Sequence, residues 1–299
     1  MFDREIPGRL RRGVGLSLML VLLVGLLTGC SRQRFTASMT APLIEAAIED
    51  AYASGDPQTV REGMAGQLLL LRGLCRSHPG HLKISTTTVQ FYASFAMLFI
   101  QAEDPAWSEQ LYAEGKDLGL RFLMRESWFA KAWGEGPDRL RQELTERQPE
   151  RLAPILMWTA ACLGQHILLH QDRPREMLAL PYVDVLLDAS IDMQPDYFYG
   201  MPLTIKGIML ATMPQGYGGN LEEANRYFER AVAVEDGFLM HRVFQARCYS
   251  VAALDRGSFL ALLQSVEAAP ADILPEIRLI NILARRSAAD LLGRQDELF

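Results

Sequence analysis

The chain has 299 residues, of which 49% are hydrophobic and 22% are charged, and its formal net charge is −6. This composition is typical of a folded protein, and the chain is long enough to bury a sizeable core. Nucleic-acid binding needs a dense set of Lys and Arg side chains against the phosphates, so the mildly acidic balance argues against nucleic acid as a partner.

The N-terminal residues 1–29 are predicted to be a lipoprotein signal peptide. A positively charged segment, residues 9–12, precedes the uncharged apolar stretch Val14–Leu27. That stretch is shorter than the about 20 residues that a transmembrane helix needs. An uncleaved anchor helix is the less favoured alternative.

The apolar stretch ends in Leu-Thr-Gly-Cys, residues 27–30, which resembles the bacterial lipobox. In lipobox proteins the chain is cut before the Cys, and its thiol carries a diacylglycerol. We therefore expect lipidation of Cys30 and a location in the periplasm, anchored by lipid. Ser31 is not the Asp that often retains lipoproteins at the inner membrane, which favours the outer membrane.

Beyond the signal peptide we expect three parts. Residues 30–41 form the lipidated Cys and a polar tether, residues 42–293 form one all-α domain, and residues 294–299 form a frayed tail. Three cysteines remain in the mature chain, so at most one disulfide can form, and their apolar surroundings favour buried thiols instead.

Apolar spacing predicts five helices in the first half of the domain. Residues 84–89 are β-branched and favour a strand by propensity, but the aromatic residues that follow keep a helical period, so we expect a helix capped by Ser85. Residues 134–138 are predicted to be a loop. The predicted helices are 43–51, 58–76, 84–99, 105–122 and 140–146.

The second half reads as two helical hairpins followed by three further helices. The hairpins pair 154–171 with 177–193 and 197–211 with 221–234. The later helices are 238–254, 258–267 and 275–292. Short connections without a convincing strand predict an all-α fold.

One helix carries a repeat signature. Ala224, Phe228 and Ala231 are spaced four and three residues apart, so they share one face. Small residues beside an aromatic residue let a neighbouring helix approach closely, as in the second helix of a tetratricopeptide repeat. The expected architecture is therefore tetratricopeptide-like hairpins stacked into a superhelical bundle.

With these features, the chain resembles the T-component (TatT) family of TRAP transporters. The resemblance is densest over residues 152–292 and is poorer before residue 140. Asn220 stands where an Asp is usual, and both residue types cap helices. The segments that carry the resemblance are Tyr197–Gly200, Met213–Pro214, Gly218–Asn220, Ala224–Ala231, Val243–Tyr249 and Leu274–Asn281.

The resemblance implies a periplasmic lipoprotein that assembles as a homotrimer and contains a hydrophobic cavity or pore. It further implies a periplasmic solute-binding protein as partner and a small hydrophobic or carboxylate ligand, with the membrane reached through the lipid anchor. A generic tetratricopeptide scaffold for envelope assembly is the alternative.

Several residues are candidates for lining the ligand cavity. The aromatic ones can be core or cavity wall, and core is favoured. For Arg247 and Asn281 we favour a structural role if they are buried, with Asp255 or Asp290 as partner of the Arg, over contact with a ligand carboxylate. The candidates are Trp158, Tyr197, Tyr199, Tyr217, Arg247 and Asn281.

The sequence offers only weak candidates for catalytic or metal-binding motifs. His166 and His170 have a metal-ligand spacing, but no third ligand is evident, so a helix-edge pair is favoured. The Cys75, His78 and His81 group is better explained by a turn.

Cys162 lies four residues before His166, and a core thiol is favoured over a nucleophile. A wide turn is favoured over an anion site for Gly216–Gly219. We therefore expect no enzymatic activity, no cofactor and no metal.

Overall fold

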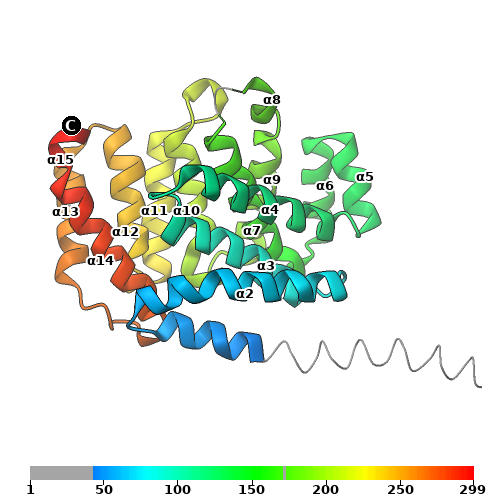
Figure 1. Cartoon of the computed structure of the whole chain (residues 1–299). Coiled ribbons are helices and arrows are strands. Elements are labelled where there is room, and N and C mark those ends of the chain that lie inside the picture. The colour runs from blue at the N-terminus through cyan, green and yellow to red at the C-terminus, as the bar shows by residue number, and fades with distance from the viewer. Residues whose placement is uncertain (1–42, 171–172) are drawn as a thin grey trace, which may run out of the picture. The chain divides into compact units, whose positions relative to one another are not determined.

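Helices make up the regular structure of residues 43–170 and 173–299, which this computed structural model describes (Figure 1). No β-strand occurs within these ranges, so the all-α prediction is confirmed. None of the helices there is both long and apolar enough to span a bilayer. The predicted signal peptide, Cys30 and the tether lie outside the described residues.

Polar residues directly before several helices set where these helices begin. The Asp56 carboxylate accepts hydrogen bonds from the amides of Gln58 and Thr59 at 3.1 and 3.2 Å, at the start of α2 (Pro57–Ser77). Asp104 caps α4 (Pro105–Leu123) in the same way. An Asp followed by Pro suits a helix start because the side chain satisfies a free amide and Pro has none to satisfy.

Two predicted boundaries are wrong. The β-branched stretch does lie in a helix, α3 (Leu82–Phe95), but His81 caps it through Nδ1, and Ser85 is buried inside the first turn. Residues 134–138 are not a loop, because α5 (Ser127–Glu135) and α6 (Pro137–Arg147) meet at Gly136 alone. The backbone of Gly136 has φ 120°, which only glycine adopts readily.

The centre of the bundle is α7 (Ala153–Leu168), which packs against α3, α4 and α9 (Leu180–Met193). Glycines allow α4 and α7 to approach closely. A Cβ atom on Gly119 would lie 2.1 Å from Thr159 Oγ1, and one on Gly115 would lie 2.7 Å from Cys162 Sγ. Both positions therefore require glycine, and the two helices are held tightly together.

The hairpin of α10 (Tyr197–Thr212) and α11 (Leu221–Val234) has the predicted packing. Ala224, Phe228 and Ala231 are fully buried, and the Phe228 ring lies against Gly207. The helix pairing is thus as expected, while the description of the hairpins as tetratricopeptide-like stays a prediction.

The first turn of α10 is kinked. Phe198, Tyr199 and Gly200 all have positive φ, at 45°, 61° and 86°. Such values cost about 1 kcal/mol or more for a non-glycine residue. The ring of His241 holds the kink, with Nε2 donating to the Tyr199 carbonyl at 2.7 Å and Nδ1 accepting from the Thr204 hydroxyl at 2.6 Å. Burial lowers the pKa of His241 to about 4, so the ring is neutral at physiological pH.

The C-terminal helices return to the start of the described domain. They are α12 (Met240–Phe244), the π-helix η4 (Gln245–Ser250), α13 (Arg256–Ala268), η5 (Pro275–Ile277) and α14 (Arg278–Gly293). α14 contacts α2. The predicted frayed tail instead includes a helical turn, α15 (Gln295–Leu298), and the Phe299 ring packs edge-on against Phe259.

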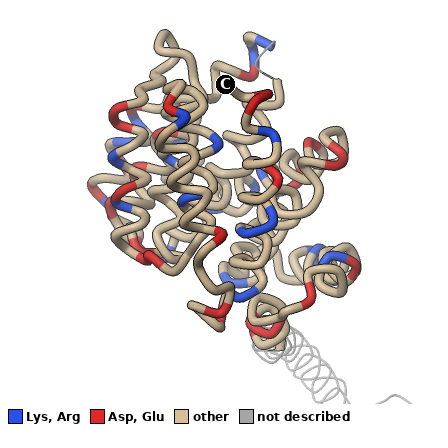
Figure 2. The backbone as a smooth tube through the Cα atoms, turned by 90° about the vertical axis from the view of Figure 1, so that its left-hand side faces the viewer, with Lys and Arg blue, Asp and Glu red and all other residues tan. Residues whose placement is uncertain are grey.

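The remaining elements are short. They are the π-helix η1 (Ala96–Ile100), the 3-10 turns η2 (Glu150–Leu152) and η3 (Gln215–Tyr217), and α8 (Pro174–Met177). Acidic and basic residues are both spread along the visible tube (Figure 2). This distribution agrees with the argument against a phosphate-binding face.

Candidate functional site

The largest of the pockets described here has a volume of about 810 Å³ and mostly apolar walls. We call it the apolar pocket. Its walls come from the N-terminal halves of α2 and α4, from η1, from α12 with η4, and from α14. Apolar lining residues include Met97, Leu98, Phe99, Trp107, Met240, Val243, Phe244 and Leu283.

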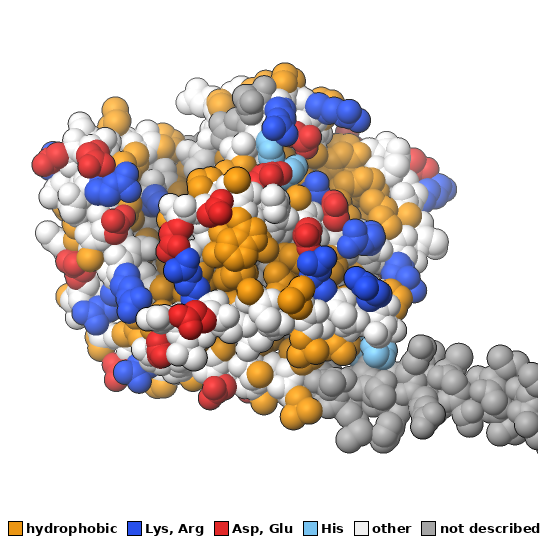
Figure 3. Space-filling view, viewed as in Figure 1, with side chains coloured by type: hydrophobic (Ala, Val, Ile, Leu, Met, Phe, Trp, Pro, Cys, Tyr) orange, Lys and Arg blue, Asp and Glu red, His pale blue; other side chains and the backbone are white. Residues whose placement is uncertain are grey.

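The apolar pocket exposes hydrophobic surface at its wall. Trp107 is 39% exposed, and its ring packs edge-on against Phe95 at 5.5 Å. The face shown in Figure 3 has an area of exposed hydrophobic side chains surrounded by both acidic and basic groups. A concave apolar surface with a few charged groups is the usual form of a small-molecule site.

Two π-helical segments line this pocket. In η1 the Gln101 amide donates to the Ala96 carbonyl five residues back, and in η4 the Val251 amide donates to Ala246 in the same way. Such segments are rare and occur often at functional sites, because the extra residue redirects side chains. Met97 to Ile100 and Arg247 all lie in these segments and line the pocket.

Three arginines line the apolar pocket together with the carboxylates of Glu62, Glu103 and Asp290, and Arg61 pairs with Glu103. The Arg247 guanidinium lies over the Phe244 ring, 5.0 Å from its centre. Within the described ranges, neither Arg247 nor Arg286 has a carboxylate at ion-pair distance. The structural partners expected for Arg247 are engaged elsewhere: Asp255 caps α13, and Asp290 lies 3.8 Å from Arg294. Arg247 is exposed, and the structural role expected for it applied only to a buried arginine.

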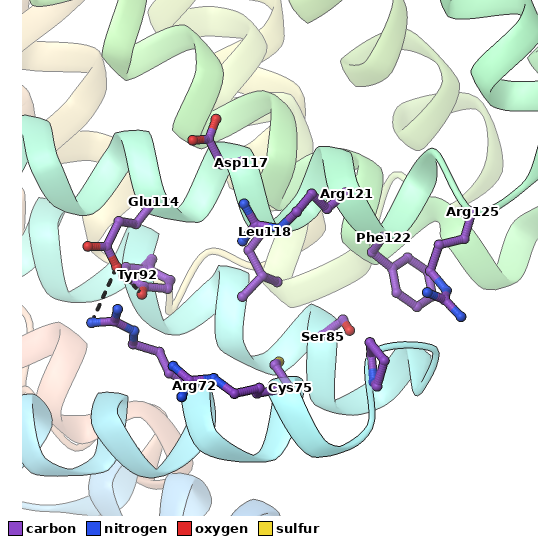
Figure 4. Close-up of a pocket in the computed structure, with 12 residues that line it drawn as sticks. Arg72, Cys75, Ser85, Tyr92, Glu114, Asp117, Leu118, Arg121, Phe122 and Arg125 are labelled. Carbon is purple, nitrogen blue, oxygen red and sulfur yellow. Dashed lines mark hydrogen bonds and ion pairs between the residues drawn. The ribbon is translucent and has the colours of Figure 1, made fainter.

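A second pocket of about 660 Å³ lies between the C-terminal halves of α2 and α4 (Figure 4). We call it the arginine pocket, because Arg72, Arg76, Arg121 and Arg125 line it. Only Arg72 has an ion-pair partner among the described residues, Glu114 at 3.5 Å. Four guanidinium groups beside two carboxylates, those of Glu114 and Asp117, leave this pocket positively charged.

The floor of the arginine pocket includes Tyr92 of α3 and the partly buried Cys75 of α2. The Tyr92 hydroxyl donates to Glu114, and burial, together with that carboxylate, raises the pKa of Tyr92. Burial also raises the pKa of the Cys75 thiol, despite hydrogen bonds from Thr88 and Ser85. Both groups are therefore uncharged near neutral pH.

Three of the six predicted cavity residues come together, but in packed surroundings. Trp158 is 1% exposed and donates from Nε1 to the Tyr197 hydroxyl at 3.1 Å. Tyr199 stacks on Phe238 at 5.5 Å. None of the three lines any pocket described here, so they form an aromatic cluster at the α10 kink.

The other three predicted residues are dispersed. Asn281 is fully buried, accepts from the Leu239 amide and donates to the Gly237 carbonyl, so it fixes the turn before α12. Tyr217 is 58% exposed and borders a polar pocket around Lys206. Only Arg247 lies at the apolar pocket.

The three described cysteines, Cys75, Cys162 and Cys248, are free thiols. Burial raises the pKa of Cys162 far above its usual value, which suits a core thiol and not a nucleophile.

Sequence reasoning missed Trp107, Arg286 and the whole arginine pocket. The arginine pocket had a signal: Arg72 with Arg76, and Arg121 with Arg125, are each four residues apart, so each pair shares a helix face. The π-helical segments had no such signal in the sequence, because no residue type is specific to them.

The comparisons with known proteins identify a family. The family model described as TRAP transporter T-component matches residues 53–299. A search of curated proteins finds no match. The matched range includes both pockets and nearly all of the described structure, and the chain therefore belongs to the TRAP transporter T-component family.

Proposed function

We propose that this TRAP transporter component binds an amphipathic organic acid in the apolar pocket. The apolar body of the ligand lies against Trp107 and Phe244, and its carboxylate faces Arg247 and Arg286. The observation that carries the proposal is an apolar pocket of about 810 Å³ with two arginines that have no carboxylate partner in the described ranges.

The binding energy comes from two sources. Covering apolar surface contributes about 25 cal/mol per Å². A guanidinium that meets a carboxylate bidentately adds a charge-assisted hydrogen-bonded pair, which is strong where the apolar wall excludes water. No covalent step is involved, in line with a transport role.

The proposed setting follows from the sequence. Cys30 anchors the mature chain by lipid in the periplasm, at the outer membrane. The chain assembles as a homotrimer and docks a periplasmic solute-binding protein, with which it exchanges the ligand. The family membership supports a place in a TRAP system.

Native mass spectrometry of residues 31–299, produced without the lipid, tests the proposal. We expect a trimer that carries a small extra mass, lost on organic extraction. The double variant Trp107→Ala, Arg247→Met should lose that mass and stay helical. Tyr217→Ala, at the separate polar pocket, is the matched control and should keep it.

Other outcomes favour the alternative. A ligand-free monomer that binds peptides would favour the generic scaffold. Retention of the mass by the double variant would place the ligand outside the apolar pocket.

A further inference from the structure

Two histidines and a glutamate from different elements meet on one side of the bundle. Glu109 lies on α4, His166 on α7, and His170 just after α7. The two imidazoles are 8% and 6% exposed, and their ring centres lie 4.6 Å apart. Glu109 Oε1 lies 3.7 Å from His166 Nδ1 and 3.7 Å from His170 Nε2.

No hydrogen bond joins the Glu109 carboxylate to either imidazole. His170 Nδ1 lies 2.9 Å from the His166 carbonyl, which only accepts, so Nδ1 carries the hydrogen. In the neutral ring His170 Nε2 then has a free lone pair, and it faces the Glu109 carboxylate. His166 Nδ1 is buried and has no hydrogen-bond partner at all. At 3.7 Å the contacts to Glu109 are too long for hydrogen bonds.

We propose that Glu109 Oε1, His166 Nδ1 and His170 Nε2 bind one divalent transition-metal ion of the zinc class. The three atoms lie within 4.8 Å of one another. Tetrahedral zinc with bonds of about 2.0–2.1 Å separates its ligand atoms by about 3.3–3.4 Å. The two distances of 3.7 Å to Glu109 need to contract by a few tenths of an ångström, and the separation of the two ring nitrogens, which is at most 4.8 Å, by no more than about 1.5 Å.

A hydrogen bond orients one imidazole as metal sites require, and a carboxylate lies near the outer nitrogen of the other. Metal-bound His normally directs its other ring nitrogen to a carboxylate or a backbone carbonyl. Glu176 Oε2 lies 3.6 Å from His166 Nε2, on the side of the ring away from Glu109. The His166 carbonyl holds Nδ1 of His170. The nearby cation Lys116 lies 3.5 Å from its neighbour Asp117.

The donor set selects the metal class. Two imidazoles and one carboxylate suit Zn²⁺, Co²⁺ or Ni²⁺, whereas Mg²⁺ and Ca²⁺ prefer oxygen ligands. Three protein ligands leave a fourth position open to water or to a ligand atom. The glycine contacts that hold α4 against α7 prepare the site, because they fix Glu109 relative to the two histidines.

Zn²⁺ titration of the metal-stripped full chain in detergent, followed by calorimetry, tests the site. We expect one ion per chain and a rise in Tm on Zn²⁺ addition. Co²⁺ should give the visible absorption of a tetrahedral site. The double variant Glu109→Gln, His170→Gln, which keeps side-chain size nearly constant, should bind at least about tenfold more weakly and lose the Tm rise.

His81→Gln is the matched control, because it removes a histidine that lies at the start of α3. It should bind Zn²⁺ like the unmodified chain. Stoichiometry well below one, undiminished binding by the double variant, or loss of binding in His81→Gln would each overturn the proposal. Circular dichroism of every variant establishes that the helices are intact.

Discussion

The apolar pocket and the arginine pocket share two helices and differ in chemistry. Both lie along α2 and α4, the first at their N-terminal halves and the second at their C-terminal halves. The apolar pocket exposes aromatic surface beside three arginines and three carboxylates, whereas in the arginine pocket four arginines outnumber two carboxylates.

The charges of the arginine pocket have an explanation within the fold. Arg76 lies in the last turn of α2, and Arg121 lies in the last turn of α4. Cations there stabilise the negative end of the helix dipole, by about 0.3–1 kcal/mol each. The Trp107 ring packs on one edge against Phe95 but leaves 39% of the residue exposed, and the two π-helical segments gain no such benefit from the helix dipole. The comparison therefore favours the apolar pocket as the site that serves function.

Trp107→Ala should produce the largest change in ligand binding. The exposed part of its ring offers about 100 Å², which at about 25 cal/mol per Å² corresponds to about 2.5 kcal/mol, or about sixtyfold in affinity for a long-chain monocarboxylate. Isothermal calorimetry measures the loss. Arg121→Ala, in the arginine pocket, should leave this affinity unchanged, and equal losses in both variants would erase the distinction between the pockets.

Arg247→Met should weaken binding of the same monocarboxylate by about tenfold, or about 1.4 kcal/mol, because it removes a charge-assisted hydrogen bond. Arg247→Lys should restore part of the affinity. Arg230, which lies over the Tyr227 ring at 5.0 Å outside the pocket, provides the matched control as Arg230→Met. Equal losses for both arginines would show a general charge effect.

The salt dependence of ligand affinity should distinguish the two pockets, because electrostatic attraction dominates in one and apolar burial in the other. Raising NaCl from about 0.05 to about 0.5 M should weaken binding of a short dicarboxylate to the arginine pocket by severalfold, because exposed charges are screened. Binding of a long-chain monocarboxylate should change less, since apolar burial dominates. A salt dependence of equal slope for both probes would contradict the assignment.

The smallest expected effect is on the alkylation rate of Cys75, which lies in the floor of the arginine pocket. Its pKa is raised by burial, so the thiol is protonated below that pKa, and alkylation at pH 8 should be severalfold slower than in the urea-unfolded chain. Mass spectrometry of the Cys75 peptide measures the rate. Alkylation as fast as in the unfolded chain would mean that the four arginines outweigh burial.

Much of the fold follows from local sequence, because caps act locally. Asp56 and Asp104, each followed by Pro, marked the starts of α2 and α4, and Asn220 marked α11. The missed boundary at Gly136 has the same origin: one glycine with positive φ ends α5 and begins α6, where composition suggested a five-residue loop.

The site was harder to predict because it depends on distant contacts. Arg247 was among the candidates and lines the apolar pocket, where Trp107 comes from α4 and Arg286 from α14, which packs against α2. The aromatic residues Trp158, Tyr197 and Tyr199 were expected at the same cavity. They pack instead around a kink whose positive φ values no propensity predicts.

The π-helical segments make the apolar pocket sensitive to chain length. A π-turn contains one residue more than an α-turn over the same span, so η1 and η4 each correspond to a single insertion in a regular helix. Deleting one residue from 245–250 would restore α-helical pairing and leave the flanking turns in register, while the side chains within the segment would be redirected. A descendant with that deletion would keep the bundle and change the orientation of Arg247 in the wall of the apolar pocket.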